Sequence, residues 1–187
     1  MKVEPTALPG VLVIEPAVHG DDRGWFLESW HAPRYAEHGI PTSFVQDNHS
    51  RSSRGTLRGL HAQSPGWQGK LVRCTQGAVW DVAVDVRVGS PCFGQHVAVE
   101  LSAENFRQIW LPRGLLHGFL VLGESAEIEY KCTEVYAEAA DFSVRWNDPE
   151  LGVPWPAQDP VLSPKDANAP LLREVRERLI PYAAFRM

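Results

Sequence analysis

One segment of the chain brings a histidine and a lysine together with several arginines and carries no negative charge. Residues 49–80 contain no Asp or Glu, although the whole protein has 18 basic and 23 acidic residues and a net charge of −5. The basic side chains of this band are Arg51, Arg54, Arg58, Lys70 and Arg73. Because arginine offers paired hydrogen-bond donors to phosphate, such a band at the mouth of a pocket predicts binding of a phosphorylated or otherwise anionic small molecule. A solvated basic edge is the alternative that charge alone leaves open.

His61 lies inside this band and is a candidate general base. An unperturbed histidine titrates near ~6.5, so it accepts a proton from carbon or oxygen at neutral pH when a carboxylate orients the ring. Three aspartates are candidates for that carboxylate: Asp81, Asp85 and Asp166. Tyr130 is a candidate proton donor across a pocket from His61, because an inward tyrosine hydroxyl needs a polar partner. A structural histidine and a core tyrosine are the alternatives for these two residues.

Short apolar runs separated by turns must position these side chains. The chain has 15 Gly and 15 Pro, and their spacing between apolar runs is typical of strands joined by turns. The clearest strand is Val79 to Val88, in which Trp80 and the valines at alternate positions share one face while Asp81 and Asp85 lie on the other. Further strands are expected at Val11 to Glu15, Phe44 to Asn48, Thr56 to Gln63, Lys70 to Gln76, Gln95 to Leu101, Arg107 to Leu111, Leu116 to Leu122 and Ala126 to Thr133. This density of strands predicts an all-β sandwich or barrel.

The predicted strand around His61 raises a geometric problem. Strict alternation places Arg58 on one face and His61 on the other. If both contact one ligand, Gly59 between them must supply a bulge or a twist.

Helices are expected to be few and peripheral. Ala32 to His38 reads as a helix that ends at Gly39, and Leu171 to Ile180 as a charged helix before Pro181. Six of the prolines fall between Pro149 and Pro170. We therefore expect residues 1–187 to form a single β-barrel domain in which residues 146–187 are a Pro-rich wrapping segment and a C-terminal helix, with a floppy tail as the alternative.

Composition and cysteine spacing exclude several classes of protein. The acidic balance argues against nucleic-acid binding, and the longest aliphatic run near the N-terminus, residues 11–14, is far below the ~20 residues that cross a bilayer. Neither a signal peptide nor a membrane anchor is visible. The three cysteines form no C-x-x-C pair, which predicts buried thiols in a reducing cytoplasm. The histidines form no His-x-His pair of the kind that holds a metal in many cupin barrels, so we expect neither metal nor other cofactor.

With these residues in view, the sequence from about Gly10 to Leu172 resembles the dTDP-4-dehydrorhamnose 3,5-epimerase family. The matching motifs are Gly20-Asp21-Asp22-Arg23-Gly24, Phe44-Val45-Gln46-Asp47-Asn48, Arg58-Gly59-Leu60-His61, Gly69-Lys70-Leu71-Val72-Arg73, Asp81-Val82-Ala83-Val84-Asp85, His117-Gly118-Phe119, Tyr130-Lys131, Trp146-Asn147-Asp148-Pro149 and Ser163-Pro164-Lys165-Asp166. The resemblance implies an all-β, cupin-like double-stranded β-helix, or jelly-roll barrel, with a few short peripheral helices. It also implies a homodimer that uses no metal.

The resemblance implies a reaction in which protons leave and return at C3 and C5 of a dTDP-4-keto-6-deoxyhexose, beside the C4 ketone. His61 matches the family's general base, and Asp166 matches the carboxylate that orients it. Lys70 matches the cation that stabilises the enolate oxygen, and Tyr130 matches the acid on the opposite face of the sugar.

The resemblance also implies a set of binding residues. Arg58 matches the diphosphate contact, Gln46 and Asn48 match residues near the nucleotide, and His117 matches a histidine of the pocket wall. Arg23, Phe26 and Glu28 match a segment that a neighbouring subunit contributes. Asp81 matches a carboxylate behind the residues that contact the substrate.

Several positions depart from the family pattern, and they leave the exact reaction open. These positions are His19, Ala62, Leu115, Leu116 and Val135. They bear on the shape of the sugar and base pockets and spare the proposed acid, base and enolate stabiliser. The leading hypothesis is the 3,5-epimerase; the alternatives are an epimerase of C3 or C5 alone, a non-catalytic sugar-nucleotide binding protein and a metal-dependent cupin enzyme.

Overall fold

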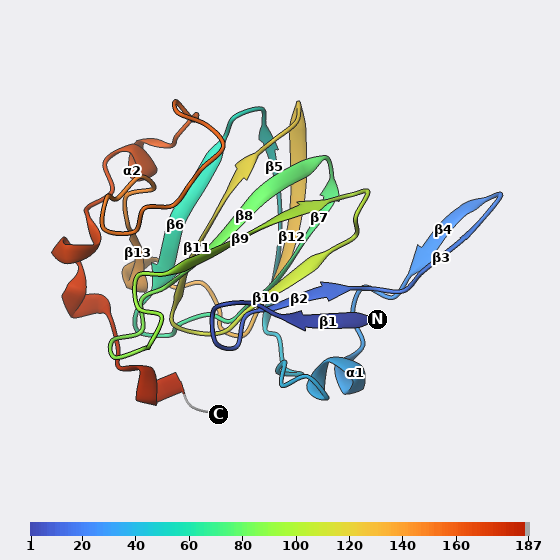
Figure 1. The fold of residues 1–187 in the computed structure, drawn as a ribbon, viewed down its shortest axis with the longest axis horizontal. Helices are drawn as coiled ribbons and strands as arrows, with labels where there is room; N and C mark the ends of the chain where they lie inside the picture. Colours follow the sequence, from blue (N-terminus) through green and yellow to red (C-terminus); the bar gives the residue numbers. More distant parts are fainter. Residues whose placement is uncertain (186–187) are drawn as a thin grey trace.

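The computed structural model describes residues 1–185 as two facing antiparallel sheets (Figure 1). In spatial order, the six-stranded sheet contains β1 (Lys2–Pro5), β2 (Leu12–Glu15), β10 (Gln108–Leu111), β7 (Lys70–Gln76), β12 (Ser125–Cys132) and β5 (Gln46–Ser53). The five-stranded sheet contains β13 (Asp141–Ser143), β6 (Leu57–Gln63), β11 (Leu115–Val121), β8 (Ala78–Asp85) and β9 (His96–Ser102). Consecutive strands alternate between the two sheets from β5 to β8 and again from β9 to β13, as in a jelly roll. The predicted all-β, cupin-like barrel is therefore confirmed.

The apolar core fills one part of the space between the sheets. Val72, Ile109 and Ile128 of the six-stranded sheet pack there with Ala83 and Phe119 of the five-stranded sheet. Burial of such side chains contributes roughly 1.5–3 kcal/mol each to the stability of the fold. The apolar cluster holds the sheets together and leaves the polar inward positions of the same strands free to line a site.

Strand β8 has the two different faces that its sequence predicts. Val82 and Val84 lie on the outer face of the barrel, where they pack with Leu172. The opposite face points inward and carries Ala83 in the core. The strand ends at Asp85 rather than at Val88, because the backbone N–H and guanidinium of Arg87 fold back onto the Asp85 carboxylate.

The tail wraps the outer face of the five-stranded sheet, but the predicted C-terminal helix is wrong. Residues Leu171 to Ile180 form two short 3-10 turns instead, η2 (Leu172–Glu174) and η3 (Arg176–Arg178). Val175 lies between them with φ −122° and breaks the helical path. Because side chains three residues apart line up in a 3-10 turn, Leu172 and Val175 both bury against the outer face of the sheet.

The same tail contains a short helix that the sequence did not predict, α2 (Pro164–Ala167). Ser163 caps it by accepting a hydrogen bond from the Asp166 N–H, and proline at the first helical position suits such a start. A β-bridge between Thr56 and Val161 fixes the chain just before it. The helix is thereby held beside the start of β6.

The N-terminal part of the chain adds elements outside the barrel. Helix α1 (Ala32–Ala36) is confirmed, whereas the hairpin of β3 (Val18–Asp21) and β4 (Gly24–Leu27) was not predicted. Figure 1 shows this hairpin projecting away from both sheets. Strands β1 and β13 and the length of β5 also went unpredicted, since their sequences are short or polar. The remaining short turns are η1 (Glu138–Ala140) and η4 (Tyr182–Phe185).

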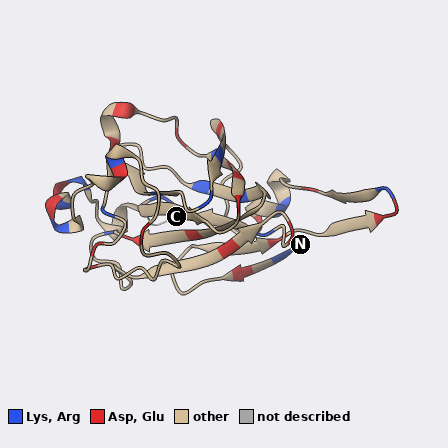
Figure 2. Ribbon diagram, turned by 90° about the horizontal axis from the view of Figure 1, so that it is seen from above, with Lys and Arg blue, Asp and Glu red and all other residues tan. Residues whose placement is uncertain are grey.

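Charge is distributed over the molecule rather than gathered on one face. Figure 2 shows basic and acidic positions scattered over sheets and tail, with both signs at the tip of hairpin β3–β4. No helix within residues 1–185 combines the length and apolar character that a membrane crossing needs.

Candidate active site

A bulge in β6 places Arg58 and His61 on the same inner face of the barrel. His61 pairs with His117 on β11, and Arg58 pairs with Phe119. Two residues separate Arg58 from His61 on β6, whereas one residue separates His117 from Phe119 on β11, so β6 contains one extra residue. Phe119 belongs to the inner core, and partners directly opposite each other point to the same side. Gly59 adopts φ 135°, and a Cβ there would lie 2.6 Å from the Gly118 Cα. The bulge or twist that was expected at Gly59 if Arg58 and His61 share a ligand is present as a bulge.

His61 is paired with Asp166 from helix α2. The distance from His61 Nε2 to Asp166 Oδ1 is 2.5 Å, and the Asp166 side chain is 3% exposed while that of His61 is 31% exposed. Burial alone would raise the pKa of Asp166, but hydrogen bonds from His61, Ser163 and the Gly59 amide outweigh it and lower the pKa. Asp166 is therefore an anion that accepts from Nε2, and His61 Nδ1 is the ring nitrogen available for proton transfer.

The three aspartates that the sequence left open as partners of His61 have separate roles. Asp85 is buried against Arg87 and Ser90. Asp81 accepts a hydrogen bond from His117, with 2.9 Å between His117 Nε2 and Asp81 Oδ2. Only Asp166 is bonded to His61 among the described residues.

Lys70 and Tyr130 lie on neighbouring strands of the opposite sheet. The Lys70 ammonium is 5.8 Å from the centroid of the Tyr130 ring, a cation–π distance. Burial lowers the pKa of Lys70, whereas nearby Cys132, Asp81 and Asp141 oppose this decrease. Burial raises the pKa of Tyr130, so its hydroxyl keeps its proton at neutral pH. A cation and a proton donor thus line the wall that faces His61.

The predicted nucleotide contacts on β5 share this inner face. Asn48 is directly opposite Tyr130, and Gln46 Nε2 donates to Asn48 Oδ1 at 2.9 Å. The side-chain oxygen of Gln46, Oε1, also accepts a hydrogen bond from the Tyr136 backbone N–H at 2.7 Å. Arg58 is exposed and donates from Nε to Ser52 Oγ at 2.9 Å.

Three predicted binding residues lie away from the pocket of their own chain. Arg23 and Phe26 belong to the projecting hairpin (Figure 1). Phe26 is 70% exposed, and Arg23 is bonded to Asp21 of the same hairpin. Glu28 follows the hairpin and is paired with Arg34. Within one chain, these residues are not brought to His61.

The structure adds residues at the rim that the sequence reasoning missed. Lys165 of α2 forms an ion pair with Asp141 of β13, and the Tyr136 hydroxyl is 3.3 Å from Asp141 Oδ2. Because β13 pairs with β6, this contact ties the helix that carries Asp166 to the strand that carries His61. In the sequence, the one feature that could have indicated a role for Lys165 is its position directly before Asp166.

Most of the basic band predicted at residues 49–80 points outward. Arg51, Arg54 and Arg73 form ion pairs with acidic residues on the outside of the six-stranded sheet or its edge. Arg58 and Lys70 are the exceptions: neither forms an ion pair within residues 1–185. The predicted anion-binding band is therefore reduced to two cations at the inner pocket.

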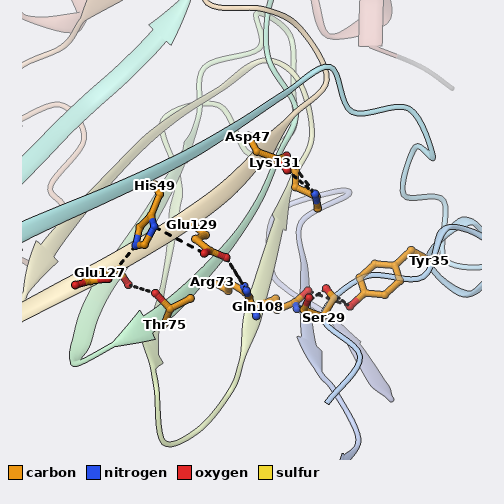
Figure 3. Close-up of polar contacts among 10 residues, drawn as sticks. All are labelled: Ser29, Tyr35, Asp47, His49, Arg73, Thr75, Gln108, Glu127, Glu129 and Lys131. Carbon is orange, nitrogen blue, oxygen red and sulfur yellow. Dashed lines mark hydrogen bonds and ion pairs between the residues drawn. The ribbon is translucent and has the colours of Figure 1, made fainter. Parts of the chain in front are cut away.

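The outer face of the six-stranded sheet offers a second cavity, of about 260 Å³. Figure 3 shows its polar contacts: His49 bonds Glu127, Arg73 bonds Glu129, and Lys131 bonds Asp47. Its charges are thus satisfied by one another. The inner pocket combines a carboxylate-oriented histidine with a lysine and a protonated tyrosine, so it is the better candidate for chemistry.

The described residues were also searched for metal ligands. Between residues 1 and 185, no three His, Cys, Asp or Glu side chains are grouped closely enough to hold a metal ion. The two histidines of the inner pocket each use one ring nitrogen to bond an aspartate.

Comparison with known proteins agrees with the geometry. The family model described as dTDP-4-dehydrorhamnose 3,5-epimerase matches residues 5–174. A Pseudomonas aeruginosa protein named dTDP-4-dehydrorhamnose 3,5-epimerase is 57% identical, over 89% of this chain and 93% of its own length. A Streptomyces niveus protein named dTDP-4-dehydrorhamnose 3-epimerase is 40% identical, over 95% of this chain and 86% of its own length.

A solved structure is similar over nearly the whole chain. It is the Legionella pneumophila dTDP-6-deoxy-D-glucose-3,5-epimerase in complex with dTDP-4-keto-L-rhamnose, with a TM-score of 0.94, 51% identity and coverage of 97% of this chain and 98% of that one. Fold, inner pocket and sequence agree, and the chain belongs to the dTDP-4-dehydrorhamnose 3,5-epimerase family.

Proposed function

We propose that this protein is a dTDP-4-dehydrorhamnose 3,5-epimerase, which converts dTDP-4-dehydro-6-deoxy-D-glucose to dTDP-4-dehydro-L-rhamnose. The observation that carries the proposal is the 2.5 Å pair of His61 and Asp166 in one pocket with Lys70 and Tyr130. Family membership supports the same activity. The reaction needs neither a metal nor an organic cofactor, because the residues of the pocket supply an acid, a base and a cation.

The first half of the reaction removes a proton next to the C4 ketone. His61 Nδ1 takes the proton from carbon, the electron pair of the C–H bond moves toward the ketone oxygen, and an enolate forms. Asp166 stabilises the resulting imidazolium, since it is buried and anionic. The Lys70 ammonium stabilises the negative charge that develops on the enolate oxygen. Stabilisation of this charge is the main electrostatic requirement of the step.

The second half returns a proton from the other side. Tyr130 donates its hydroxyl proton to the carbon while the electron pair returns from the enolate, so the configuration is inverted. One proton then passes from the imidazolium back to the phenolate, and both residues regain their starting states. Inversion rather than simple exchange requires groups on both faces of the sugar, and β6 and β12 belong to opposite sheets.

The substrate is a sugar linked to a nucleoside diphosphate. Arg58 is exposed at the pocket and has no ion-pair partner within residues 1–185, so it is free to bind the diphosphate in the bidentate manner of arginine. The Legionella enzyme binds a dTDP-sugar. Gln46 and Asn48 lie along the same wall for the nucleotide.

The proposed site includes a second copy of the chain. Trp25 and Phe26 of hairpin β3–β4 are 62% and 70% exposed, which is unusual for large aromatic side chains. A homodimer in which this hairpin reaches the partner's pocket would cover them and bring Arg23, Phe26 and Glu28 to the substrate. We place the enzyme in the cytoplasm, where sugar nucleotides are made and its free cysteines stay reduced.

Incubation with dTDP-4-keto-6-deoxyglucose in D2O, followed by NMR at C3 and C5, tests the proposal. We expect deuterium at both carbons and formation of the L-sugar. Incorporation at neither carbon, with binding intact by titration calorimetry, would instead identify a non-catalytic binding protein. A metal-dependent enzyme would lose activity after treatment with a chelator, whereas we expect full activity.

An epimerase of C3 or C5 alone is the second candidate, because two departures from the family pattern lie beside the reacting groups. Ala62 and Leu115 line a small inner cavity together with Lys70 and His117. Deuterium at a single carbon would favour this candidate. The other departures lie elsewhere: Leu116 is buried in the outer apolar cluster, His19 is exposed on the hairpin, and Val135 is exposed next to Tyr136 at the rim.

A further inference from the structure

Helix α2 holds Asp166 against His61 with very little packing of its own. Within residues 163–168, Asp166 is the only buried residue. Among residues 1–185, the backbone hydrogen bonds of this segment join it only to itself and to the residue that follows it. The nearest backbone hydrogen bonds to the barrel lie outside the segment, at Val161 and Pro170. Neither apolar burial nor backbone pairing sets the position of the helix, so its side chains must do so.

The ion pair between Lys165 and Asp141 is the second polar contact of this helix with the barrel. The Asp141 side chain is 16% exposed, whereas that of Lys165 is 49% exposed. A partly buried charge gains more from its partner than a fully exposed one does. Asp141 lies on β13 directly opposite Gln63, two residues beyond His61 on β6. The two neighbouring strands therefore hold helix α2 at two adjacent residues, Asp166 through His61 and Lys165 through Asp141.

The Asp141 carboxylate is itself held by the loop that precedes β13. The Tyr136 hydroxyl lies 3.3 Å from Asp141 Oδ2, the same oxygen that meets Lys165. Burial and the negative charge of Asp141 raise the pKa of Tyr136, so the hydroxyl keeps its proton and donates it to the carboxylate. Gln63 fixes the loop, since its Oε1 accepts a hydrogen bond from the Ala137 N–H at 3.1 Å. Asp141 is thus a fixed anion to which the longer and more exposed Lys165 side chain attaches.

We propose that Asp141 is a positioning residue for the general base: it holds Lys165 and thereby keeps Asp166 in place against His61. The inference deepens the proposed function, on which it rests only for the use of the base. A carboxylate displaced by about 1 Å no longer orients the ring, and a misplacement of this size costs on the order of 10²-fold in rate. Asp141 acts through helix α2 and exchanges no proton with the substrate.

Hydrogen exchange in helix α2 tests the inference without substrate. The Ala167 amide donates to the Ser163 carbonyl at 2.9 Å, so its exchange rate measures local opening of the helix. We expect Asp141→Asn and Lys165→Met each to speed this exchange about 3–10-fold, and the double variant to add nothing, because both substitutions remove one interaction. Lys165→Arg keeps the charge and should exchange like the wild type. Lys165 is exposed, so Lys165→Met keeps the test decisive if Asp141→Asn does not fold. Unchanged exchange in the folded single variants would overturn the inference.

Another ion pair of the tail supplies the matched control. Arg176 pairs with Glu150, and their side chains are 60% and 42% exposed. This pair does not include helix α2, so Glu150→Gln should leave both the exchange of the Ala167 amide and the activity unchanged. Faster exchange at Ala167 in this variant would mean that the loss of any charge pair loosens the tail, and it would overturn the specific role of Asp141.

The ring of His61 provides a spectroscopic signature that a purely structural ion pair would not change. Asp166 accepts from Nε2, so the neutral ring should carry its proton on Nε2 alone in the wild type. In Asp141→Asn and Lys165→Met, 15N spectra should show a second population with the proton on Nδ1. His117 bonds a different aspartate and serves as the internal control, with one tautomer in every variant. A His61 ring that stays in one tautomer in both variants would overturn the inference.

The kinetic readout separates positioning of the base from binding of the substrate. Asp141→Asn and Lys165→Met should lower kcat on the order of tenfold with KM little changed, and Lys165→Arg should stay near the wild-type value. A rise in KM at unchanged kcat would assign Asp141 to substrate binding and overturn the inference. If the wild type proves inactive on dTDP-4-keto-6-deoxyglucose while exchange and tautomers change as expected, the proposed function fails and the inference about Asp141 stands.

Discussion

His61 and His117 lie directly opposite each other on adjacent antiparallel strands, and each bonds a different buried aspartate through Nε2. The two rings differ in access to the pocket, since the side chain of His61 is 31% exposed and that of His117 is 9% exposed. This difference favours His61 over His117 for the proposed base role. His117 is then part of the pocket wall, where Asp81 of the neighbouring strand β8 holds its ring by a hydrogen bond.

Replacement of His61 tests the base assignment. His61→Ala should lower kcat by about 10²–10⁴-fold, the usual contribution of a positioned general base. The fold should survive, because the side chain is only partly buried. Deuterium incorporation by NMR and the circular dichroism spectrum together check this prediction, and near-normal turnover in a folded variant would disprove the assignment.

Tyr130→Phe should separate proton exchange from inversion. His61 can still remove and return a proton on its own face, so incorporation of deuterium at carbon should outlast formation of the inverted sugar. The two rates are compared by NMR in D2O. Equal loss of exchange and inversion would argue against Tyr130 as the opposing acid.

Asp166 should make stability depend on pH in the acid range. Its pKa is lowered in the folded state, so its contribution is fully present above its unfolded pKa of about 3.9 and is lost as pH falls through the folded value. Asp166→Asn should therefore lower the free energy of unfolding by ~1–3 kcal/mol at pH 7, with a smaller difference from wild type below about pH 4. Urea unfolding at several pH values measures this. A difference that grows toward low pH would contradict the sign.

The bulge at Gly59 should tolerate no side chain. Gly59→Ala would place a Cβ 2.6 Å from the Gly118 Cα at φ 135°, and we expect a loss of ~2–4 kcal/mol in unfolding free energy together with loss of activity. Gly55→Ala is the matched control, because Gly55 also has positive φ but open space around it. Its loss should be ~1 kcal/mol, from backbone strain alone. Similar losses in both variants would mean that the close approach to Gly118 is unimportant.

Mixed dimers test whether the hairpin serves the partner's site. His61→Ala and Phe26→Ala chains should each be poorly active alone. If Phe26 acts in the partner's pocket, each hybrid dimer regains one intact site, and an equal mixture should recover about one quarter of the wild-type sites. Denaturation and refolding of the two chains together, followed by the epimerase assay, measures this. No recovery, with hybrid dimers shown by native mass spectrometry, would place Phe26 in the pocket of its own chain.

The sequence predicted strands well where apolar alternation was strong and poorly where it was weak. Strand β7 is found at the predicted residues, whereas β5 continues to Ser53 through polar residues that gave no apolar signal. The apolar spacing at Leu172 and Val175 indicated a helix, but two 3-10 turns bury the same side chains. The local sequence pattern predicted which side chains would be buried, whereas tertiary packing determines the path of the backbone.

The site was predictable in its residue types and less so in its pairings. The requirement for a bulge at Gly59 followed from alternation alone. The choice among Asp81, Asp85 and Asp166 did not follow from the residue pattern; the family resemblance pointed to Asp166, and the structure pairs Asp166 with His61. Only the docking of the tail decides that Asp166 meets His61, and nothing in local sequence encodes that contact.

Helix α2 makes the proposed chemistry depend on the docking of the C-terminal tail onto the barrel. His61 and Asp166 are 105 residues apart in sequence, and the helix is held to the barrel by the Thr56–Val161 bridge and the Asp141–Lys165 pair. A molecule whose tail has come loose would leave His61 without the carboxylate that the proposed mechanism needs. The docked fraction of the tail is thus an upper limit on the active fraction of the enzyme.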